Sequence, residues 1–408
     1  MVGLHPVAFE SGQGVVLRDV DGNEYIDFSS GIVVTNLGHA HPSVAAAVGR
    51  AATELDNVHD FAHPRKVEAM EALASITPGD LKLFTFFCAG TEAVEGAMRV
   101  ARAKTGKHGF VSFFNDYHGR TGGAAGVTAA QASNGLRPSG SFLVPSGHAY
   151  RCTMCTGGPC DLRCAGLLEQ SIGQNMPGQM AGVVMELITN GNGATVYDER
   201  YVPAVAEICQ RNGMMFIADE VATGFGRTGA WFASDHYGVV PDVMCIGKGL
   251  GNGFPVTAIA VREEHAEALA LSFPSTSYGG NPMACAAIIE TIRLMKEERL
   301  VEHCHDLGEY ALGLLREMQS RHKIVGEVRG KGALLAVELV KDKATREPFP
   351  QAGNLVYQTA FRNGVSWATA GHILRITPPI VMSKEIFARG LEIVEDAIYE
   401  VEREFGYT

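Results

Sequence analysis

Short apolar runs alternate with amphipathic stretches through the middle of the chain. Apolar residues recur at helical spacing in Glu92–Ala103. Runs of four or five apolar residues predict buried strands at Leu83–Phe87, Phe110–Phe114, Ala181–Met185, Met214–Ala218, Val243–Ile246 and Thr257–Val261. Strands that are apolar on both faces are typical of a mostly parallel sheet with helices on each side. The pattern therefore predicts an α/β fold built on such a sheet.

The two ends of the chain follow a different pattern. Near the start, the runs GVVLRD and EYIDF predict strands joined by the turn DVDGN. Towards the end, Pro282–Glu317 has a long helical pattern, Val325–Val340 predicts strands and Lys384–Phe405 predicts a closing helix. We expect residues 46–290 to form a large α/β domain, and residues 1–45 and 291–408 to form a smaller α+β domain.

Composition narrows the class of protein. The 408 residues are 46% hydrophobic and 19% charged, which is typical of a globular protein rather than a disordered one. The net charge of −11 argues against nucleic-acid binding, which needs a basic face. No run approaches the roughly 18–20 apolar residues of a membrane span. The opening stretch MVGLHPVAFESGQG has no basic or apolar signal region, so we expect a cytoplasmic protein.

Polar residues follow several of the predicted strands directly. Asp219 comes after MMFIA, Glu186 after AGVVM and Lys248 after VMCIG, while the turn Cys88–Thr91 follows LFTFF and opens a helix. Each alone is usually a turn residue, but in an open α/β sheet ligands bind at the carboxyl ends of the strands. A carboxylate, an amine and an anion-binding helix start on one rim suit a phosphorylated cofactor that carries an aldehyde and a basic ring nitrogen.

Seven motifs, in order along the chain, resemble those of the class III, fold type I, pyridoxal-phosphate-dependent aminotransferases. The most specific is DEVATGFGRTG from Asp219, followed 29 positions later by Lys248 in PDVMCIGKGLGNGFP. The others are NLGHAHP at 36–42, GTEA at 90–93, YHGRT at 117–121, GGNP at 279–282 and LRITPP at 374–379. The resemblance covers essentially the whole chain and points to the 4-aminobutyrate, acetylornithine and ω-amino acid enzymes. It implies pyridoxal 5'-phosphate as cofactor.

The resemblance implies two catalytic residues. Lys248 is expected to form the Schiff base with the cofactor aldehyde and then to move the proton between Cα and C4′, because only an amine forms an exchangeable imine. A solvated surface lysine is the alternative, and the glycines that flank Lys248 after an apolar strand argue against it. Asp219 is expected to pair with the pyridinium nitrogen, which keeps the ring protonated and able to accept electrons.

The resemblance also implies a set of cofactor contacts. Gly90 and Thr91 would bind the phosphate at a helix start, and Tyr117 would stack on the ring with His118 beside it. The further contacts implied are Glu186 near the cofactor hydroxyl, Val221 after Asp219, and Ser277 on the phosphate of a neighbouring subunit. The last of these implies a homodimer, or a dimer of dimers, with shared active sites.

Two departures from the family pattern concern the substrate. Ala222 stands where a glutamine commonly bonds the cofactor's ring oxygen, and Gly191 stands where 4-aminobutyrate and ornithine enzymes have a glutamate. That glutamate pairs with an arginine that corresponds to Arg375. Without it, Arg375 is expected to stay available as a two-pronged carboxylate clamp. Arg120 matches the arginine that holds the substrate carboxylate in 4-aminobutyrate and acetylornithine aminotransferases, so two guanidinium groups would surround the site.

Four of the nine cysteines are close in sequence: Cys152, Cys155, Cys160 and Cys164. Four thiols in thirteen residues suit one structural zinc ion or an iron–sulfur cluster. The spacing differs from that of standard zinc modules, so a cysteine-rich loop without a ligand remains the alternative.

The sequence thus predicts an aminotransferase that moves an amino group from an ω-amino acid or related amine to a 2-oxo acid such as pyruvate or 2-oxoglutarate, by a ping-pong mechanism. Racemases, epimerases, decarboxylases and phospholyases on the same scaffold share Lys248 and Asp219, so these residues do not separate them. A non-catalytic sensor domain of a transcription regulator is the other alternative. It would need a DNA-binding module, and the chain has no spare basic segment.

Overall fold

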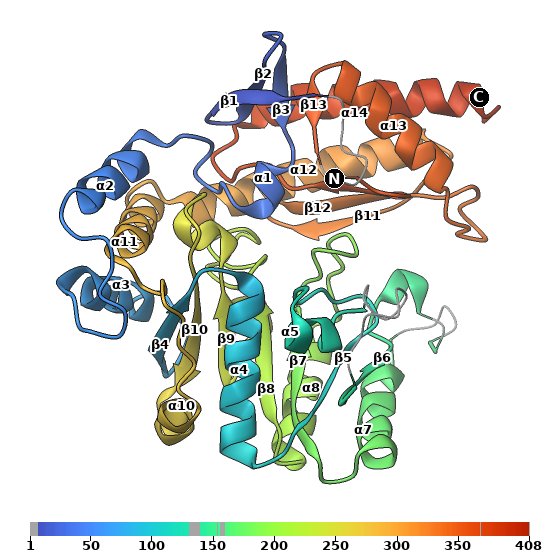
Figure 1. Ribbon diagram of the computed structural model, residues 1–408. Helices are drawn as coiled ribbons and strands as arrows, with labels where there is room; N and C mark the ends of the chain where they lie inside the picture. The colour runs from blue at the N-terminus through green and yellow to red at the C-terminus, as the bar shows by residue number, and fades with distance from the viewer. Residues whose placement is uncertain (1–6, 130–138, 153, 156–159, 368, 408) are drawn as a thin grey trace.

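A seven-stranded sheet forms the centre of the computed structural model, which describes residues 7–129, 139–152, 154–155, 160–367 and 369–407 (Figure 1). The strand order is β4-β10-β9-β8-β7-β5-β6. The strands are β4 (Leu81–Phe87), β5 (Gly109–Phe113), β6 (Ser141–Val144), β7 (Met180–Met185), β8 (Met215–Glu220), β9 (Val243–Ile246) and β10 (Thr257–Arg262). Only β10 runs against its neighbours, β4 and β9, whereas the other pairings are parallel. The predicted mostly parallel sheet is confirmed.

Helices cover both faces of this sheet (Figure 1). On one face lie α4 (Gly90–Thr105) and α5 (Gly122–Val127), and on the other lie α7 (Arg163–Asn175) and α8 (Tyr201–Arg211). Successive side chains of a strand point to opposite faces. Accordingly, Ile217 packs in the core with α4 and its neighbour Phe216 packs in the core with α8. This double burial is why the strands are mostly apolar, and their charged residues lie at or near the ends.

Further helices flank the edge of the sheet formed by β4 and β10. They are α2 (Pro42–Ala52), α3 (Pro64–Ala74), α10 (Ala266–Ser272) and α11 (Pro282–Glu297), and α11 packs against both α2 and α3. The remaining short elements are α1 (Ser30–Val33), α9 (Ala233–Tyr237), and the 3₁₀ turns η1 (Ala149–Arg151), η2 (Lys248–Gly251) and η3 (Glu263–His265).

Two smaller sheets lie beyond the carboxyl ends of the parallel strands (Figure 1). An antiparallel sheet has the order β11-β12-β15-β14, with β11 (Val325–Lys331), β12 (Leu334–Leu339), β14 (Thr369–Ala370) and β15 (Ile373–Ile376). The other has the order β1-β2-β3-β13, with β1 (Phe9–Gln13), β2 (Val16–Asp19), β3 (Glu24–Asp27) and β13 (Val365–Ser366). Its β3–β13 pair joins the two ends of the chain. Packed around these sheets are α12 (Leu300–Arg321), α13 (Pro350–Arg362) and α14 (Lys384–Glu404).

The continuous helical stretch predicted for Pro282–Glu317 is wrong in one respect. The helix breaks at Arg299, which has a left-handed φ of 51°, so that α11 ends at Glu297 and α12 begins at Leu300. Leu300 packs in the same core as Ile292 and Met295 of α11. The change of direction therefore keeps the apolar faces of both helices on one core, which a helical periodicity alone does not reveal.

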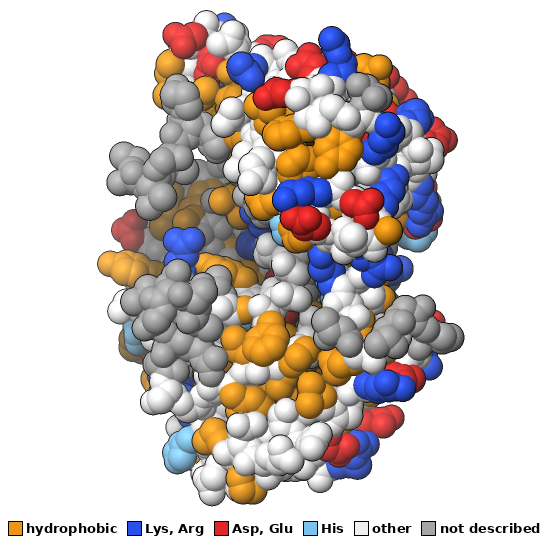
Figure 2. All heavy atoms as spheres, turned by 90° about the vertical axis from the view of Figure 1, so that its right-hand side faces the viewer, with side chains coloured by type: hydrophobic (Ala, Val, Ile, Leu, Met, Phe, Trp, Pro, Cys, Tyr) orange, Lys and Arg blue, Asp and Glu red, His pale blue; other side chains and the backbone are white. Residues whose placement is uncertain are grey.

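Acidic and basic side chains are interspersed on the face shown in Figure 2, with apolar side chains between them. None of the helices described is long and apolar enough to span a bilayer.

Candidate active site

A cavity of about 410 Å³ opens where the parallel strands end. Three of its lining residues come from successive strand ends: Glu186 after β7, Asp219 on β8 and Lys248 after β9. The cavity brings together these and six more of the residues predicted from the sequence, namely Gly90, Thr91, Tyr117, His118, Arg120 and Val221. Ser277, Arg375 and the four clustered cysteines do not belong to its lining.

Both carboxylate oxygens of Asp219 have a hydrogen-bonding partner. Oδ2 lies 2.7 Å from Nδ1 of His118, and Oδ1 accepts a hydrogen bond of 3.1 Å from the backbone N–H of Val221. The second ring nitrogen of His118 lies 3.0 Å from the hydroxyl of Ser112 on β5. Burial lowers the pKa of His118, but the hydrogen bond to Asp219 and its charge raise it, and the net shift is upward. The pair fixes a carboxylate at the floor of the cavity.

Glu186 is anchored by backbone groups on either side. Its Oε2 accepts from the N–H of Tyr117 at 2.9 Å and its Oε1 accepts from the N–H of Asn190 at 3.1 Å. Burial, together with the charge of Asp219, raises the pKa of Glu186 to about 7. The carboxyl group is therefore fixed in place beside Tyr117 and shares the cavity with Asp219.

Lys248 begins η2 with a left-handed φ of 47°, a conformation that costs a non-glycine residue about 1–3 kcal/mol. Its ammonium group forms no hydrogen bond or ion pair with the residues that the structure describes, although it lines the cavity. Burial lowers the pKa of Lys248, and the charges of Glu186 and Asp219 oppose that shift. A half-buried, unpaired amine with a lowered pKa is suited to covalent chemistry with a carbonyl compound.

An anion-binding cradle lies at the start of α4. Gly90 and Thr91 occupy its first turn, where backbone N–H groups are unpaired and the helix dipole favours negative charge. Glu92 turns away from this position, because its carboxylate accepts from the N–H groups of Cys88 and Ala89 at 2.9 and 3.0 Å. A Cβ at Gly119 would come within 2.5 Å of the Thr91 hydroxyl, so only glycine allows this close approach.

Two arginines differ in their relation to the cavity. Arg120 is exposed and lines it. Arg375 lies on β15 and is half-buried, and its Nε has no hydrogen-bond partner among the described residues. Burial lowers the pKa of Arg375, and the charge of Glu186 opposes this. Arg375 is therefore close enough to interact electrostatically with Glu186, although it does not line the cavity itself.

The whole chain matches a known family. Residues 2–398 match the family model described as "Aminotransferase class-III". The chain belongs to the class III aminotransferases. A 5-aminovalerate aminotransferase of Pseudomonas aeruginosa is 33% identical over 98% of this chain and 95% of its own length. A 4-aminobutyrate aminotransferase of Mycobacterium leprae is 36% identical over 95% of this chain and 90% of its own length. The solved structure of an omega transaminase variant from Pseudomonas jessenii has a TM-score of 0.93 and 27% sequence identity to this chain. The match covers 99% of this chain and 95% of that one.

Membership of the class III aminotransferases makes this chain an amino-group-transferring enzyme and implies pyridoxal 5'-phosphate as its cofactor. The residues of the cavity fit that group. Lys248 offers an unpaired amine, Asp219 a fixed carboxylate, and the start of α4 an anion cradle next to Gly119. The predicted family and fold type are confirmed, and the chain is an aminotransferase that requires an amino donor and a 2-oxo acid.

Ser277 lies outside the cavity of its own chain in this aminotransferase. It is exposed, and its carbonyl oxygen accepts from Nδ2 of Asn57 at 2.6 Å. Its neighbour Thr276 points its hydroxyl towards Oε1 of Glu92, at 3.5 Å. The predicted role of Ser277 towards a neighbouring subunit therefore stays a prediction.

Two of the clustered cysteines are in direct contact. The N–H of Cys155 donates to Sγ of Cys152 at 3.3 Å, and Sγ of Cys155 lies 3.4 Å from Asp161. Cys164 is buried on α7. The described residues contain groups with metal-ligand spacing, but none of these includes a cysteine. Positions 153 and 156–159 of the loop lie outside the described residues.

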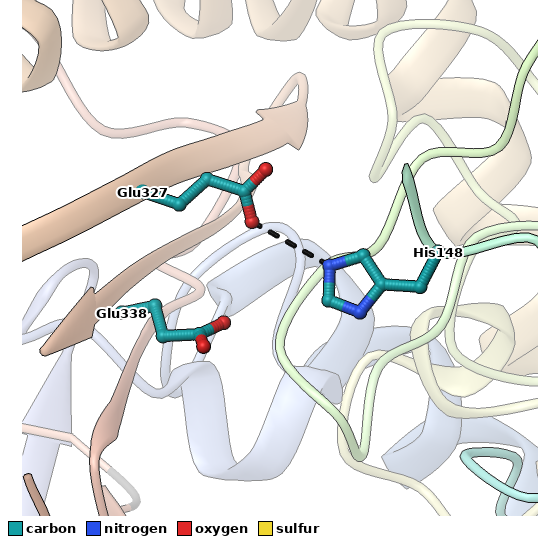
Figure 3. Close-up of side chains that lie close together, drawn as sticks. All are labelled: His148, Glu327 and Glu338. Carbon is teal, nitrogen blue, oxygen red and sulfur yellow. Dashed lines mark ion pairs between the residues drawn. The ribbon is translucent and has the colours of Figure 1, made fainter. Parts of the chain in front are cut away.

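One such group lies where the 139–152 segment meets β11 and β12, and it was not singled out from the sequence (Figure 3). Nε2 of His148 is 3.5 Å from Glu327, and Glu338 lies beside them. Arg329 donates from Nη1 to both carboxylates, at 2.5 and 2.6 Å, and from Nε to the carbonyl oxygen of Gly193 at 2.7 Å. Arg151 also pairs with Glu338, so two guanidinium groups neutralise the two carboxylates and the group is a structural bridge to the 186–193 segment rather than a cation site.

Proposed function

We propose that this class III aminotransferase takes the amino group from an ω-amino acid or a related amine and delivers it to a 2-oxo acid such as pyruvate or 2-oxoglutarate, in a ping-pong cycle. The observation that carries the proposal is the unpaired amine of Lys248 in the same cavity as Asp219, with Arg120 on its wall. The similarity to 5-aminovalerate and 4-aminobutyrate aminotransferases supports an amino group remote from the carboxylate.

Pyridoxal phosphate, when bound, supplies an aldehyde that takes up the amino group and a ring that accepts the electrons left on Cα. Asp219 would hold the ring nitrogen, and the hydrogen bond from His118 keeps this carboxylate in one orientation. Gly90 and Thr91 would hold the phosphate, Tyr117 would stack on the ring, and Glu186 and Val221 would complete the contacts. Lys248 would make the covalent link and afterwards carry the proton that leaves Cα.

The substrate carboxylate would be bound by two guanidinium groups. Nε of Arg375 lacks a partner among the described residues, and an unpaired buried donor is costly unless a ligand satisfies it. Gly191 offers no carboxylate to neutralise Arg375, and a Cβ at this position would meet Cβ of Tyr117 at 3.4 Å. Arg375 therefore stays ready for a carboxylate in both half-reactions, with Arg120 as the second clamp.

The test is a single-turnover titration of the cofactor-loaded enzyme without an oxo acid. The visible absorbance of the bound cofactor is followed as ω-amino acids, α-amino acids and unsubstituted alkylamines of matched length are added. We expect ω-amino acids to convert the cofactor fastest, and a 2-oxo acid to restore the original spectrum. Conversion by none of these donors, or conversion without recovery by any oxo acid, contradicts the proposal. The Lys248→Ala variant is the control for absorbance changes unrelated to transfer.

We also propose that the chain divides into a small domain, residues 1–45 and 291–408, and a large domain, residues 46–290. We further propose that the protein is a homodimer and that it is located in the cytoplasm. Apolar side chains around the contact of Asn57 with Ser277 support an interface with a second copy, since Phe61 is 79% and Tyr278 is 67% exposed. Nine free cysteines suit a reducing compartment. Light scattering during size-exclusion chromatography tests the dimer, and Phe61→Asp is expected to yield monomers of reduced activity.

Finally, we propose that Cys152, Cys155, Cys160 and Cys164 hold a structural zinc ion or iron–sulfur cluster. The backbone N–H of Cys155 donates to Sγ of Cys152, and, against the opposing effect of burial, this bond helps to lower the pKa of Cys152, which favours the thiolate that a metal needs. Metal analysis of the purified enzyme is the test, with the Cys152→Ser, Cys155→Ser double variant as control. Stoichiometric zinc, or iron with visible colour, that the double variant loses supports the site. A metal-free wild type contradicts it.

A further inference from the structure

Three carboxyl groups meet below the cavity, and the catalytic proposal uses only two of them. Asp116, in the loop after β5, is 1% exposed. Its Oδ2 accepts from the backbone N–H of Glu186 at 2.9 Å and lies 3.7 Å from Nε2 of His118. His118 in turn contacts Asp219. The chain Glu186–Asp116–His118–Asp219 therefore links the ends of β5, β7 and β8 in one buried cluster.

The cluster holds too many acids for all of them to be ionised. Asp116, Glu186 and Asp219 are all buried, and like charges that share one desolvated cluster repel strongly. The cationic partners available are His118 and, across the cavity, Lys248, which makes no ion pair with described residues. Burial and the charge of Glu186 raise the pKa of Asp116 well above its usual range. One proton on the cluster relieves the repulsion, so the question is which group carries it.

The hydrogen bonds distinguish the three carboxyl groups. Glu186 accepts from two backbone N–H groups, one on each oxygen. Asp219 accepts from a backbone N–H and lies 2.7 Å from a histidine nitrogen. Asp116 accepts from a single N–H, and its Oδ1 has no partner among the described residues. Hydrogen bonds from fixed donors stabilise an anion, so Asp116 is the least stabilised of the three as a carboxylate.

The groups on the remaining side of Asp116 do not supply the missing charge. On that side, the titratable residues whose pKa depends on the charge of Asp116 are Tyr197, before α8, and Tyr201, on α8. Both are buried, and neither hydroxyl has a hydrogen-bond partner among the described residues. Phenols are neutral near pH 7, and burial raises the pKa of Tyr197 further. No cation faces Asp116 from α8.

We infer that Asp116 is the protonated member of this cluster: a neutral positioning residue that holds the Glu186 backbone and leaves the negative charge on Glu186 and Asp219. The inference deepens the proposed function, because it assigns the charges of that same site. A neutral Asp116 leaves the full charge of Asp219 available to the cofactor ring nitrogen and that of Glu186 available on the hydroxyl side of the cofactor. An ionised Asp116 would compete with both for His118 and Lys248.

Infrared spectroscopy of the cofactor-free protein tests the charge state without any catalysis. We expect the carbonyl band of a buried carboxylic acid near pH 7, shifted when aspartate side chains carry ¹³C in the wild-type protein. Asp116→Asn should remove this band, whereas the matched variant Glu186→Gln should keep it. The absence of any band that shifts with labelled aspartate, or an aspartate-sensitive band that survives in Asp116→Asn, overturns the inference. Glu220, whose pKa burial raises to about 7, contributes only a band that shifts with labelled glutamate. Because the labelling uses the wild type, the result does not depend on whether a variant folds.

The pH dependence of kcat/KM supplies the second readout. Asp116→Asn keeps an acceptor for the Glu186 N–H and adds no charge, so its pH profile should match that of the wild type. Asp116→Ala leaves that N–H unpaired and should lower kcat/KM tenfold or more at every pH. A shift of the apparent pKa by a full unit in Asp116→Asn would mean that the wild type carries a negative charge there. Failure of the wild type to transfer amino groups would refute the proposed function and leave the infrared result readable.

Discussion

His118 and Asp219 lie 101 positions apart in the chain, and their side chains meet at 2.7 Å between Nδ1 and Oδ2. Ser112 holds the other ring nitrogen at 3.0 Å, so the imidazole is fixed between β5 and β8. A carboxylate with a fixed histidine partner keeps its orientation when a ligand arrives. Under the proposed function, the contact would keep Asp219 aimed at the ring nitrogen of the cofactor, where the charge of Asp219 matters most.

Replacing Asp219 with asparagine should separate binding from chemistry. Asp219→Asn keeps the size of the side chain, so the cofactor should remain bound. The rate of proton removal from the donor should fall by several orders of magnitude, because a neutral amide does not stabilise a protonated ring. Stopped-flow absorbance with a deuterated donor measures this step. Unchanged kinetics would mean that another group holds the ring nitrogen.

Lys248→Ala should abolish turnover and leave the fold intact. Without the amine there is no covalent link to the cofactor and no base beside Cα. Circular dichroism and thermal unfolding of the cofactor-free variant serve as controls for folding. The backbone of residue 248 is left-handed, and alanine has the same strain there as lysine. The free energy of unfolding should therefore change little. A variant that retains full amino transfer would refute the assignment of Lys248.

The sequence was most informative where burial dictates the pattern. Fully apolar strands implied the doubly covered sheet, and the polar residues directly after them fell on one rim because parallel strands end together. The break at Arg299 was not predicted, because α11 and α12 bury their apolar faces in one core and the helical spacing of apolar residues continues across it. Asp116 gave no signal of its own, since its meaning depends on Glu186, 70 positions away. The Arg329 contact with Gly193 likewise depends on residues 136 positions apart.

Glu220 provides a test of pH-dependent stability away from the reaction. It is buried, and it accepts from the N–H groups of Ala233 and Ser234 at 2.9 and 2.7 Å, at the start of α9. Burial raises its pKa from 4.5 to about 7. Between these values the unfolded chain ionises while the folded protein keeps the proton, so stability falls as the pH rises. The expected loss is roughly 3 kcal/mol between pH 4.5 and 7.

The measurement compares Tm of the cofactor-free wild type with that of Glu220→Gln across this range. The glutamine variant keeps the acceptor and cannot ionise, so the difference isolates one group. We expect the wild type to lose Tm relative to the variant up to about pH 7 and then to level off. Parallel curves would show that Glu220 is already ionised at pH 4.5 in the folded protein.

Arg375 should contribute strongly to recognition of the oxo acid. Arg375→Ala should reduce kcat/KM for one oxo acid by roughly 2–4 kcal/mol of transition-state binding, mostly through a higher KM. Arg375→Lys should recover only part of this, because an ammonium group does not make a two-pronged contact. A loss of less than about threefold in the alanine variant would mean that Arg120 binds the carboxylate alone.

The last prediction concerns Gly191, which offers no carboxylate to pair with Arg375. A Cβ built there would meet Cβ of Tyr117 at 3.4 Å, an ordinary contact, so a side chain can start at this position beside the ring that we propose to stack on the cofactor. Gly191→Glu should pair with Arg375 whenever the donor brings no carboxylate to it, and thus reduce the cost of leaving that guanidinium buried and unpaired. We expect kcat/KM for unsubstituted alkylamines to rise about tenfold relative to ω-amino acids, or about 1.4 kcal/mol. Gly191→Gln has the same shape without the charge. If it changes the ratio equally, the effect is steric and masking of Arg375 does not explain the donor preference.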